Sequence, residues 1–408
     1  MMDKDNNIRQ QLHIKSVPVA DVDQFNDLLR YVFQVTNQDL LESGYEEGEL
    51  VRAKQPILEK SDVIGWYNQT QLVSQLAIYP CEVNIHGKVF KMAGLTGVGT
   101  YPEYAGHGLM HDLVKVGLEK MRDNQQWISY LYPYSIPFYR KKGWEIMSDH
   151  LTFDLRDTQL PKPVPVTGHV ARKEIDDFDV LDTYDRFAHQ THGAMIRDQL
   201  AWDEYWRWEN EEERTAAVYY DENQVATGYV IYWIAEEVFH LKEMIYLNQE
   251  ARVGLWNFIS AHYSMVEHVK GHIYKDEPIA FLMDAGDIKE TIEPYYMARI
   301  VDVKDFLKAY PFENITEDIS FEVTDPMAAW NNGLFHIHVN RDGKLSINQT
   351  SANGYVVKVD IQTLTAMLMS YRRPSYLASI ERLQASKNAI KYLENIIPIE
   401  TPYFSDYF

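Results

Sequence analysis

The chain has 408 residues, of which 46% are apolar and 24% are charged. These fractions are ordinary for folded globular proteins, and at roughly 150 residues per domain the length predicts two or three domains, which excludes a disordered chain or a mini-protein. The formal net charge of −21 argues against nucleic-acid binding, which needs a basic face. It favours either a cationic ligand or a surface charge that only keeps the protein in solution.

The cysteine content and the apolar runs bear on location. Cys81 is the single cysteine and cannot form an intrachain disulfide, so nothing indicates an oxidising compartment. No apolar run approaches the roughly 18 residues of a membrane-spanning helix, and the first residues lack the pattern of a signal peptide. The sequence therefore predicts a cytoplasmic protein without a membrane span.

The first 155 residues alternate between helix-like and strand-like patterns, which predicts an α/β unit. The predicted elements, in chain order, are a helix over 19–33, an antiparallel meander over 63–67, 71–79, 81–85 and 89–92, a strand over 93–101, a glycine-bearing turn over 102–108, a helix over 109–124, a strand over 127–132, a short helix over 136–142 and a last strand over 150–155. The proline-rich stretch at 161–165 predicts a linker after this unit.

The order of elements then recurs in a degenerate form, with strands over 216–220, 226–234 and 237–246 and a helix over 254–269. Residues 251–255 echo 105–109 but keep one glycine of the turn, so we interpret the second unit as structural. After Ile300 the composition changes to a small α+β pattern whose last predicted helix covers 376–387. The predicted domains are 1–158, 159–299 and 300–408, and the fold class is α/β with an α+β terminal domain.

The turn before the helix at 109–124 carries the first chemical signal. The start of a helix presents free backbone N–H groups and the positive end of the helix dipole, which together favour an anion. Gly106 and Gly108 allow the backbone to approach a pyrophosphate closely. Because glycine at a strand-to-helix turn is often only a tight bend, this signal is weak by itself.

A second segment makes the signal specific. Residues 138–144 read Phe-Tyr-Arg-Lys-Lys-Gly-Trp, which resembles the F-Y-x-K-x-G-F/W ending of the GNAT acetyltransferase superfamily. The whole chain, with two GNAT-like units, a small α+β domain and the aromatic ending 402–408 (Pro-Tyr-Phe-Ser-Asp-Tyr-Phe), resembles the Eis (enhanced intracellular survival) family of N-acetyltransferases. That family ends in a domain of the sterol-carrier-protein fold.

The resemblance implies acetyl-CoA as co-substrate and a role for particular residues. Backbone groups of Val98, Gly99 and Thr100 would pair with the pantetheine arm as an added strand does. The pyrophosphate would lie on Gly106, His107, Gly108, Leu109, Met110 and His111, and the reactive end of the cofactor would lie by Tyr134 and Ser135. Tyr139 would be the general acid, and the C-terminal carboxylate of Phe408 would reach the active site. Relatives usually carry an arginine-rich stretch where this chain has Ala105, Gly106 and His107.

Acetyl transfer to an amine needs a base, because only the neutral amine attacks a thioester. The strand at 93–101 contains no Asp, Glu or His, so the base must come from elsewhere, and the resemblance supplies the carboxylate of Phe408. An ordinary α-carboxyl has a pKa of about 3.5, so we expect desolvation to raise it or a water to relay the proton. His107 and His111 are alternative bases, although histidines at a helix start are more often solvated.

The sequence therefore predicts an acetyl-CoA-dependent N-acetyltransferase that acts on a primary amine of an aminoglycoside-, polyamine- or lysine-like acceptor. The acidic residues Glu42, Glu46, Glu47 and Glu49 could attract such a cation or form an ordinary solvated loop. No metal site is predicted, because His336 and His338 lack a third ligand nearby in the sequence. The resemblance also implies a homo-oligomer, commonly a hexamer. The alternative is a non-catalytic acyl-CoA sensor or lipid carrier.

Overall fold

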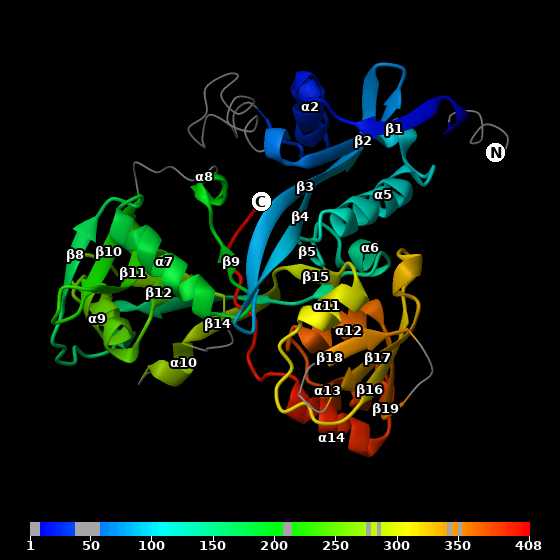
Figure 1. Cartoon of the computed structure of the whole chain (residues 1–408). Coiled ribbons are helices and arrows are strands. Elements are labelled where there is room, and N and C mark those ends of the chain that lie inside the picture. Colours follow the sequence, from blue (N-terminus) through cyan, green and yellow to red (C-terminus); the bar gives the residue numbers. More distant parts are fainter. Residues whose placement is uncertain are drawn as a thin grey trace.

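The computed structural model describes residues 9–36, 58–206, 214–274, 279–283, 287–340, 345–349 and 353–408. Figure 1 shows three sheet-containing units, with the blue and cyan unit at the top, a green unit at the lower left and an orange and red unit at the lower right. Both helices and sheets are present, as the predicted fold class requires. Among the described helices, none is both long enough and apolar enough to cross a bilayer.

The first sheet has the strand order β1-β2-β3-β4-β5-β15-β6, and β9 is added to β3. The bounds are β1 Leu12–Ser16, β2 Asp62–Asn68, β3 Gln71–Ile85, β4 Lys88–Thr100, β5 Ile128–Leu131, β6 Glu145–Ile146, β9 Met195–Ile196 and β15 Met297–Ile300. The prediction of two short strands over 71–85 and two over 89–101 was wrong, because each pair is one continuous strand of a long hairpin.

Helices cover both faces of this sheet. On one face, α2 (Val22–Phe33) packs Phe25 against Tyr67, Leu72 and Ala77. On the other face, α5 (Leu109–Asp123) packs Leu113 and its neighbours against a separate set of strand residues. The two sets alternate along β2 and β3 because successive side chains of a strand point to opposite faces.

The first two units exchange strands. β7 (Asp149–Arg156) forms where a strand was predicted, but it pairs with β13 and β14 in the second sheet and not within its own unit. β15 comes from the far end of the second unit and pairs with β5 and β6 in the first sheet. The prediction that the strand over 150–155 completes the first unit was therefore wrong. That strand is β7, and its pairing partners lie more than 100 residues away in the chain.

The second sheet has the order β14-β7-β13-β12-β11-β10-β8. Its further strands are β8 His169–Lys173, β10 Thr215–Tyr220, β11 Ala226–Ala235, β12 Val238–Tyr246, β13 His268–Ile273 and β14 Lys289–Pro294, and its helices include α7 Phe178–Gln190, α8 Gln199–Trp206 and α9 Gln249–Ser260. The predicted helix at 254–269 was displaced. The Asn248 side chain caps α9 two residues after β12 ends at Tyr246. Gly254 therefore lies inside the helix, against Tyr219, and not in a turn.

The third sheet has the order β18-β17-β16-β19-β20. Its strands are β16 Ile319–Thr324, β17 Gly333–Val339, β18 Leu345–Asn348, β19 Tyr355–Asp360 and β20 Gln384–Ala385, and its helices are α11 Val303–Ala309, α12 Ile361–Leu368, α13 Pro374–Ser379 and α14 Lys387–Ile396. The single helix predicted over 376–387 was wrong, because α13 ends at Ser379 and a new helix begins at Lys387. The Ser386 hydroxyl caps this new helix by accepting from the Ala389 N–H. Phe306 and Leu368 of this unit share one buried core with Phe90 and Tyr130 of the first sheet.

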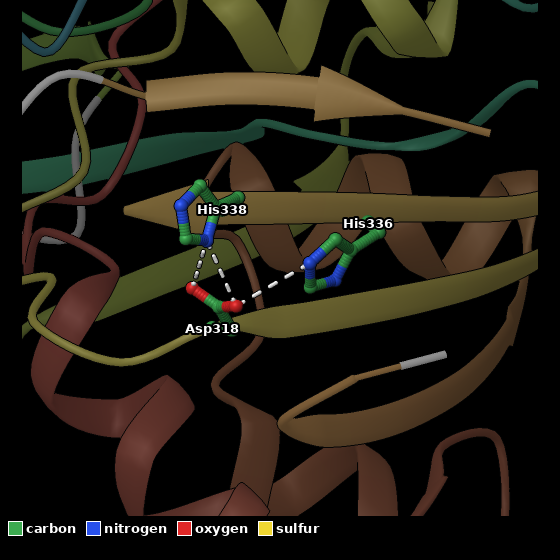
Figure 2. Close-up of side chains that lie close together, drawn as sticks. All are labelled: Asp318, His336 and His338. Atoms are coloured by element: carbon green, nitrogen blue, oxygen red, sulfur yellow. Dashed lines mark hydrogen bonds and ion pairs between the residues drawn. The ribbon is translucent and has the colours of Figure 1, made fainter. Parts of the chain in front are cut away.

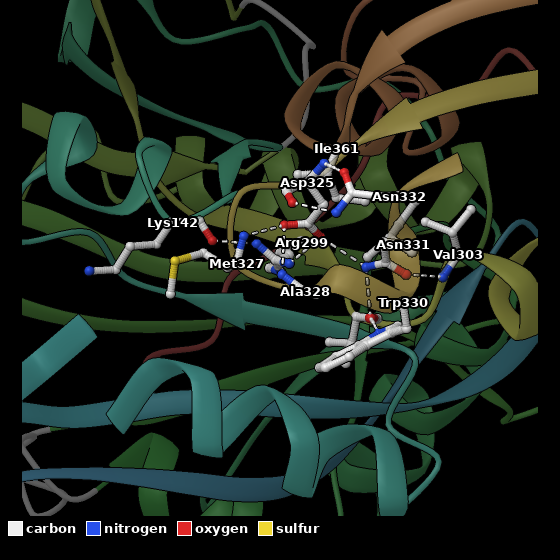
Figure 3. Close-up of polar contacts among 12 residues, drawn as sticks. Lys142, Arg299, Val303, Asp325, Met327, Ala328, Trp330, Asn331, Asn332 and Ile361 are labelled. Carbon is white, nitrogen blue, oxygen red and sulfur yellow. Dashed lines mark hydrogen bonds and ion pairs between the residues drawn. The ribbon is translucent and has the colours of Figure 1, made fainter. Parts of the chain in front are cut away.

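A buried polar cluster joins the first and third units. Figure 3 shows the guanidinium of Arg299, on β15, between the backbone carbonyl of Lys142 and the carboxylate of Asp325. Asn331 donates to the same carboxylate at 2.9 Å and accepts from the Val303 backbone at 2.9 Å. The side chains of Arg299 and Asp325 are fully buried. Because Arg299 also donates to the Lys142 carbonyl, this ion pair holds the segment around Lys142 in place.

Candidate active site

The first sheet opens next to its parallel strand pair. β4 pairs with β5 only from Met92 to Gly94, and beyond that pair no described strand joins the same edge of β4. We call this opening the β4–β5 fork. A β-bulge follows at once, since the three steps from Thr96 to Gly99 oppose two on β3, and Gly97 adopts a φ of 61°. Such a bulge bends β4 further away from β5.

The structure therefore leaves backbone groups of β4 free where an extended ligand can pair. Val98, Gly99 and Thr100 lie beyond the fork, on the part of β4 whose second edge has no strand partner among the described residues. A chain-like ligand with amide groups, such as the pantetheine arm, fits an open strand edge of this kind.

The glycine turn follows directly on β4. Gly106 and Gly108 have φ angles of 82° and 75°, which L side chains rarely adopt. A methyl group on Gly106 would meet no atom of the described residues within 4 Å, so this part of the structure leaves the space beside the start of α5 open. His107, Leu109, Met110 and His111 lie in the same turn and the first residues of the helix, where backbone N–H groups favour an anion.

Positive side chains reach this turn from two distant segments. Arg9 donates to the backbone carbonyl of His107 at 3.2 Å and forms an ion pair with Asp112. Lys142 is buried, with its ammonium 4.7 Å from the Phe138 ring centroid. Burial together with the charge of Lys142 lowers the pKa of His111. Sequence reasoning missed both cations, because neither lies in the turn itself; the Lys-Lys-Gly of the motif was the available signal for Lys142.

Tyr139 lies on the face of the sheet that carries α5. It is the fourth residue of the short helix α6 (Ile136–Arg140), which begins after Ser135 with Pro137 in its first turn. The ring packs at 6.4 Å from Trp144, and the hydroxyl has no hydrogen-bond partner among the described residues. Burial raises the pKa of Tyr139 to about 12. Tyr134, just before the helix, is 84% exposed.

Phe408 lies on the opposite face of the same sheet. Its ring packs 6.1 Å from Tyr79 and 5.5 Å from Tyr296, and its backbone N–H donates to the Tyr296 hydroxyl at 3.3 Å. A methyl group on Gly94 would come within 2.8 Å of the Phe408 ring, so the ring rests on the last residue of β4 before the fork. Tyr139 and Phe408 thus belong to different faces of one sheet, with the fork as the opening between them.

The chain reaches this position along a defined path. Figure 1 shows the red C-terminal segment rising from the third unit and ending between the first two units. Tyr403 donates its backbone N–H to the carbonyl of His192 at 2.8 Å. Gly193, with a φ of 86°, leaves room for Pro402, since a methyl group there would lie 2.8 Å from the proline ring.

A buried ion cluster holds the last residues. Arg197 donates from Nε to Asp406 at 2.7 Å and from Nη2 to Glu243 at 2.9 Å, and all three side chains are almost fully buried. Ser405 and Tyr229 donate to Glu243 at 2.9 and 2.6 Å. Burial raises the pKa of Asp406, whereas for Glu243 the opposing effect of Arg197 and these hydrogen bonds lowers it. The terminal segment is therefore anchored rather than frayed.

A cavity of about 170 Å³ lies beside the chain end. Residues of β3, of the segment after β9 and of the C-terminus line it, among them Tyr79, Cys81, Glu82, Asp198, Leu200 and Phe408. An adjoining hollow of about 640 Å³ shares Glu82 and Asp198 and adds Asp123. Three carboxylates and one ammonium group, that of Lys91, line this hollow. Its net charge is therefore negative, which suits a cationic ligand.

Two expectations need comment. The prediction that His336 and His338 lack a third ligand was wrong, because Asp318 at the start of the neighbouring strand contacts both imidazoles. Strand pairing brought the three together across 18 and 20 residues of sequence, which spacing alone cannot indicate. The acidic stretch Glu42, Glu46, Glu47 and Glu49 lies outside the described residues.

Models of known protein families match three successive segments of the chain. Two models described as acetyltransferase (GNAT) domain match residues 13–147 and 193–300, and a model described as sterol carrier protein domain matches residues 303–405. No curated protein matches the chain.

Solved structures match over nearly the full length. A probable N-acyltransferase from Enterococcus faecalis is 28% identical, with a TM-score of 0.87 over 97% of this chain and 99% of that one. A GCN5-related N-acetyltransferase from Anabaena variabilis is 22% identical, with a TM-score of 0.84 over 97% and 100%. Eis1 from Mycobacterium abscessus is 17% identical and shares the fold, with a TM-score of 0.78 over 97% and 100%. The chain is therefore an N-acetyltransferase of Eis-like architecture, with two GNAT domains and a C-terminal sterol carrier protein domain.

Proposed function

We propose that the protein transfers the acetyl group of acetyl-CoA directly to a primary amine of a cationic acceptor, such as an aminoglycoside, a polyamine or a lysine side chain. The observation that carries this proposal is the anchored chain end, whose terminal residue rests on Gly94 at the β4–β5 fork. Acetyl-CoA supplies the acetyl group as a reactive thioester.

The chain holds the co-substrate along one line. Val98, Gly99 and Thr100 offer backbone groups at the open edge of β4. The turn at 106–111 offers backbone N–H groups to the pyrophosphate. Arg9 and Lys142 supply positive charge that the turn itself lacks, so they stand in for the arginines that relatives carry there. Tyr134 and Ser135 border the reactive end.

Tyr139 acts as the general acid. With a pKa raised to about 12 by burial, the phenol keeps its proton throughout the neutral range, which suits a donor and excludes a base. Its hydroxyl is not engaged by another described side chain, so it is available to protonate the departing thiolate of coenzyme A.

The α-carboxylate of Phe408 accepts the proton from the attacking amine, directly or through a water. The apolar surroundings of the ring, formed by Tyr79, Tyr296 and Phe404, favour the desolvation that makes a carboxylate more basic. Glu82 and Asp198 in the adjoining cavity attract the cationic acceptor. A covalent route through Cys81 is disfavoured, because burial raises the pKa of its thiol and keeps it protonated.

Thiol release from acetyl-CoA, measured against a panel of polyamines, aminoglycosides and lysine peptides, tests the proposal. A few residues added after Phe408 are expected to abolish turnover while acetyl-CoA binding survives, and the same residues added before Met1 serve as the control. Undiminished turnover with the C-terminal extension would rule out the terminal carboxylate as base. If the unmodified chain binds acetyl-CoA but acetylates no amine, the hypothesis of a non-catalytic acyl-CoA sensor or lipid carrier is favoured.

Three further expectations stay proposals. We propose functional boundaries near residues 158 and 299, although β7, which ends before the first boundary, pairs in the second sheet, and β15, at the second boundary, pairs in the first sheet. We also propose self-association, up to the hexamer that the resemblance implies, and a cytoplasmic location. Light scattering coupled to size-exclusion chromatography measures the assembly directly.

A further inference from the structure

The sterol carrier protein domain gathers three potential metal ligands at one end of its sheet. His336 and His338 lie two residues apart on β17, so they project to the same face, and Asp318 precedes β16, the neighbouring strand. Figure 2 shows both imidazoles turned toward the Asp318 carboxylate. The Asp318 Oδ2 atom lies 3.4 Å from His336 Nε2 and 3.0 Å from His338 Nδ1.

The His336 ring is held in place through its Nδ1 atom, which lies 3.0 Å from the Ser320 hydroxyl oxygen. That hydroxyl also donates to the carbonyl of Asn353 at 2.9 Å, and in this arrangement it accepts from His336 Nδ1. The Nε2 atom of His336 is directed at the Asp318 carboxylate, and in the same arrangement its lone pair is available to a metal ion.

The Nε2 atom of His336 and the Asp318 Oδ2 atom lie 3.4 Å apart, and a cation between them is attracted to both. His336 is buried, with 7% exposure. A metal ion satisfies the lone pairs of both imidazoles and the carboxylate at once.

The distances suit a small divalent ion. Ligand atoms that lie about 2.1 Å from a tetrahedral zinc ion are roughly 3.4 Å from one another. The two measured separations are 3.4 and 3.0 Å, and all three ligand atoms lie within 4.8 Å of one another. We propose that Asp318, His336 and His338 bind a first-row divalent cation, with zinc the ion that best fits two imidazoles and a carboxylate.

The surroundings have the features of a metal site rather than of a surface ion pair. Ser320 fixes the tautomer and orientation of His336, as second-layer partners of metal-bound histidines do. The Val339 backbone donates to Asp318 Oδ1 at 3.0 Å and Asn353 donates to Oδ2 at 3.4 Å, which orient the carboxylate. His338 is half exposed, so an ion can enter from solvent and keep a water or an external ligand. The ion would tie β16 to β17, a structural role separate from acetyl transfer.

Calorimetric titration of the chelator-treated full-length chain with zinc tests the site. We expect stoichiometric binding and a rise in the melting temperature, since a ligand that binds only the folded state stabilises it. His338→Ala and Asp318→Asn should abolish binding, and Ser320→Ala should weaken it by about 10- to 100-fold. His189→Ala, which removes an exposed histidine paired with Asp185, is the control and should bind like the parent.

Cobalt provides an independent readout. Its visible absorption reports the number and geometry of ligands in the bound complex, and the band should appear with the parent chain and be missing with His338→Ala. If neither metal binds the parent chain, the cluster is an ordinary ion pair and the inference is wrong. Acetyl-transfer activity is not the readout, so failure of the metal site leaves the proposed function standing.

Discussion

A single methyl group at Gly143 is expected to destabilise the first domain strongly. Gly143 has a φ of 95°, and its Cβ position is occupied by the guanidinium of Arg299. Alanine in the left-handed region costs roughly 1–2 kcal/mol. Moving Arg299 away leaves Asp325 buried without its partner, and breaking one side of a buried ion pair costs about 3–5 kcal/mol. The sum, about 4–7 kcal/mol, is a large share of the roughly 5–15 kcal/mol that stabilises a typical protein.

The chain offers a matched control for this experiment. Gly87 has a φ of 83°, but a methyl group there meets no atom within 4 Å, so Gly87→Ala carries the backbone cost alone. Urea unfolding followed by tryptophan fluorescence suits the comparison, because Trp144 is fully buried 5.3 Å from the guanidinium carbon of Arg299. Gly143→Ala should lose about 3–5 kcal/mol more than Gly87→Ala, the cost of the broken pair. Equal losses would refute the role assigned to Arg299.

Three further predictions concern the site. Because the pKa of Tyr139 is raised to about 12, deprotonation of this residue should not lower kcat between pH 7 and 10. Tyr139→Phe should lower kcat by about 10²- to 10⁴-fold and leave the Kd for acetyl-CoA unchanged. Tyr263→Phe, at an exposed tyrosine, is the control and should change neither kcat nor Kd. Lys142→Met should raise the KM for acetyl-CoA by roughly tenfold, because it removes one charge-assisted contact of about 1.5 kcal/mol. Lys141 is an exposed neighbour, and Lys141→Met should leave this KM unchanged. Similar effects in the two variants would contradict the role of Lys142. Burial raises the pKa of Asp406, so its stabilising contribution is present below the unfolded value of about 3.9 and is lost as the pH rises through the folded value. As the pH rises from 4 to 7, the melting temperature of Asp406→Asn should therefore fall less than that of the parent. Identical pH profiles of the two melting temperatures would contradict the raised pKa of Asp406.

The order of elements around the site was predictable because the signals are local. The strand, glycine turn and amphipathic helix over 93–124 follow from hydrophobic periodicity and from glycine, and the structure has β4, the turn and α5 in that order. The Phe-Tyr-Arg-Lys-Lys-Gly-Trp motif at 138–144 supported the acetyltransferase class, which the domain comparisons show. Each of these signals lies in one continuous stretch of the chain, 93–124 for the strand, turn and helix and 138–144 for the motif.

Other features depend on contacts between distant segments. The exchange of β7 and β15 between sheets was not predictable, because a strand pattern records which face is buried and not which strand lies beside it. Arg9 beside His107 and Asp318 beside the two histidines likewise join residues that are far apart in the chain.

Hydrophobic periodicity, glycine and a compact motif act over short distances, so the acetyltransferase class, the α/β character and a turn expected to favour an anion could be predicted from the sequence. The contacts of Arg197 with Asp406, of Phe408 with Gly94 and of Arg299 with Gly143 appear only in the folded structure. The physical reason is that burial and ion pairing between segments depend on how the sheets assemble, and a linear pattern does not contain that assembly.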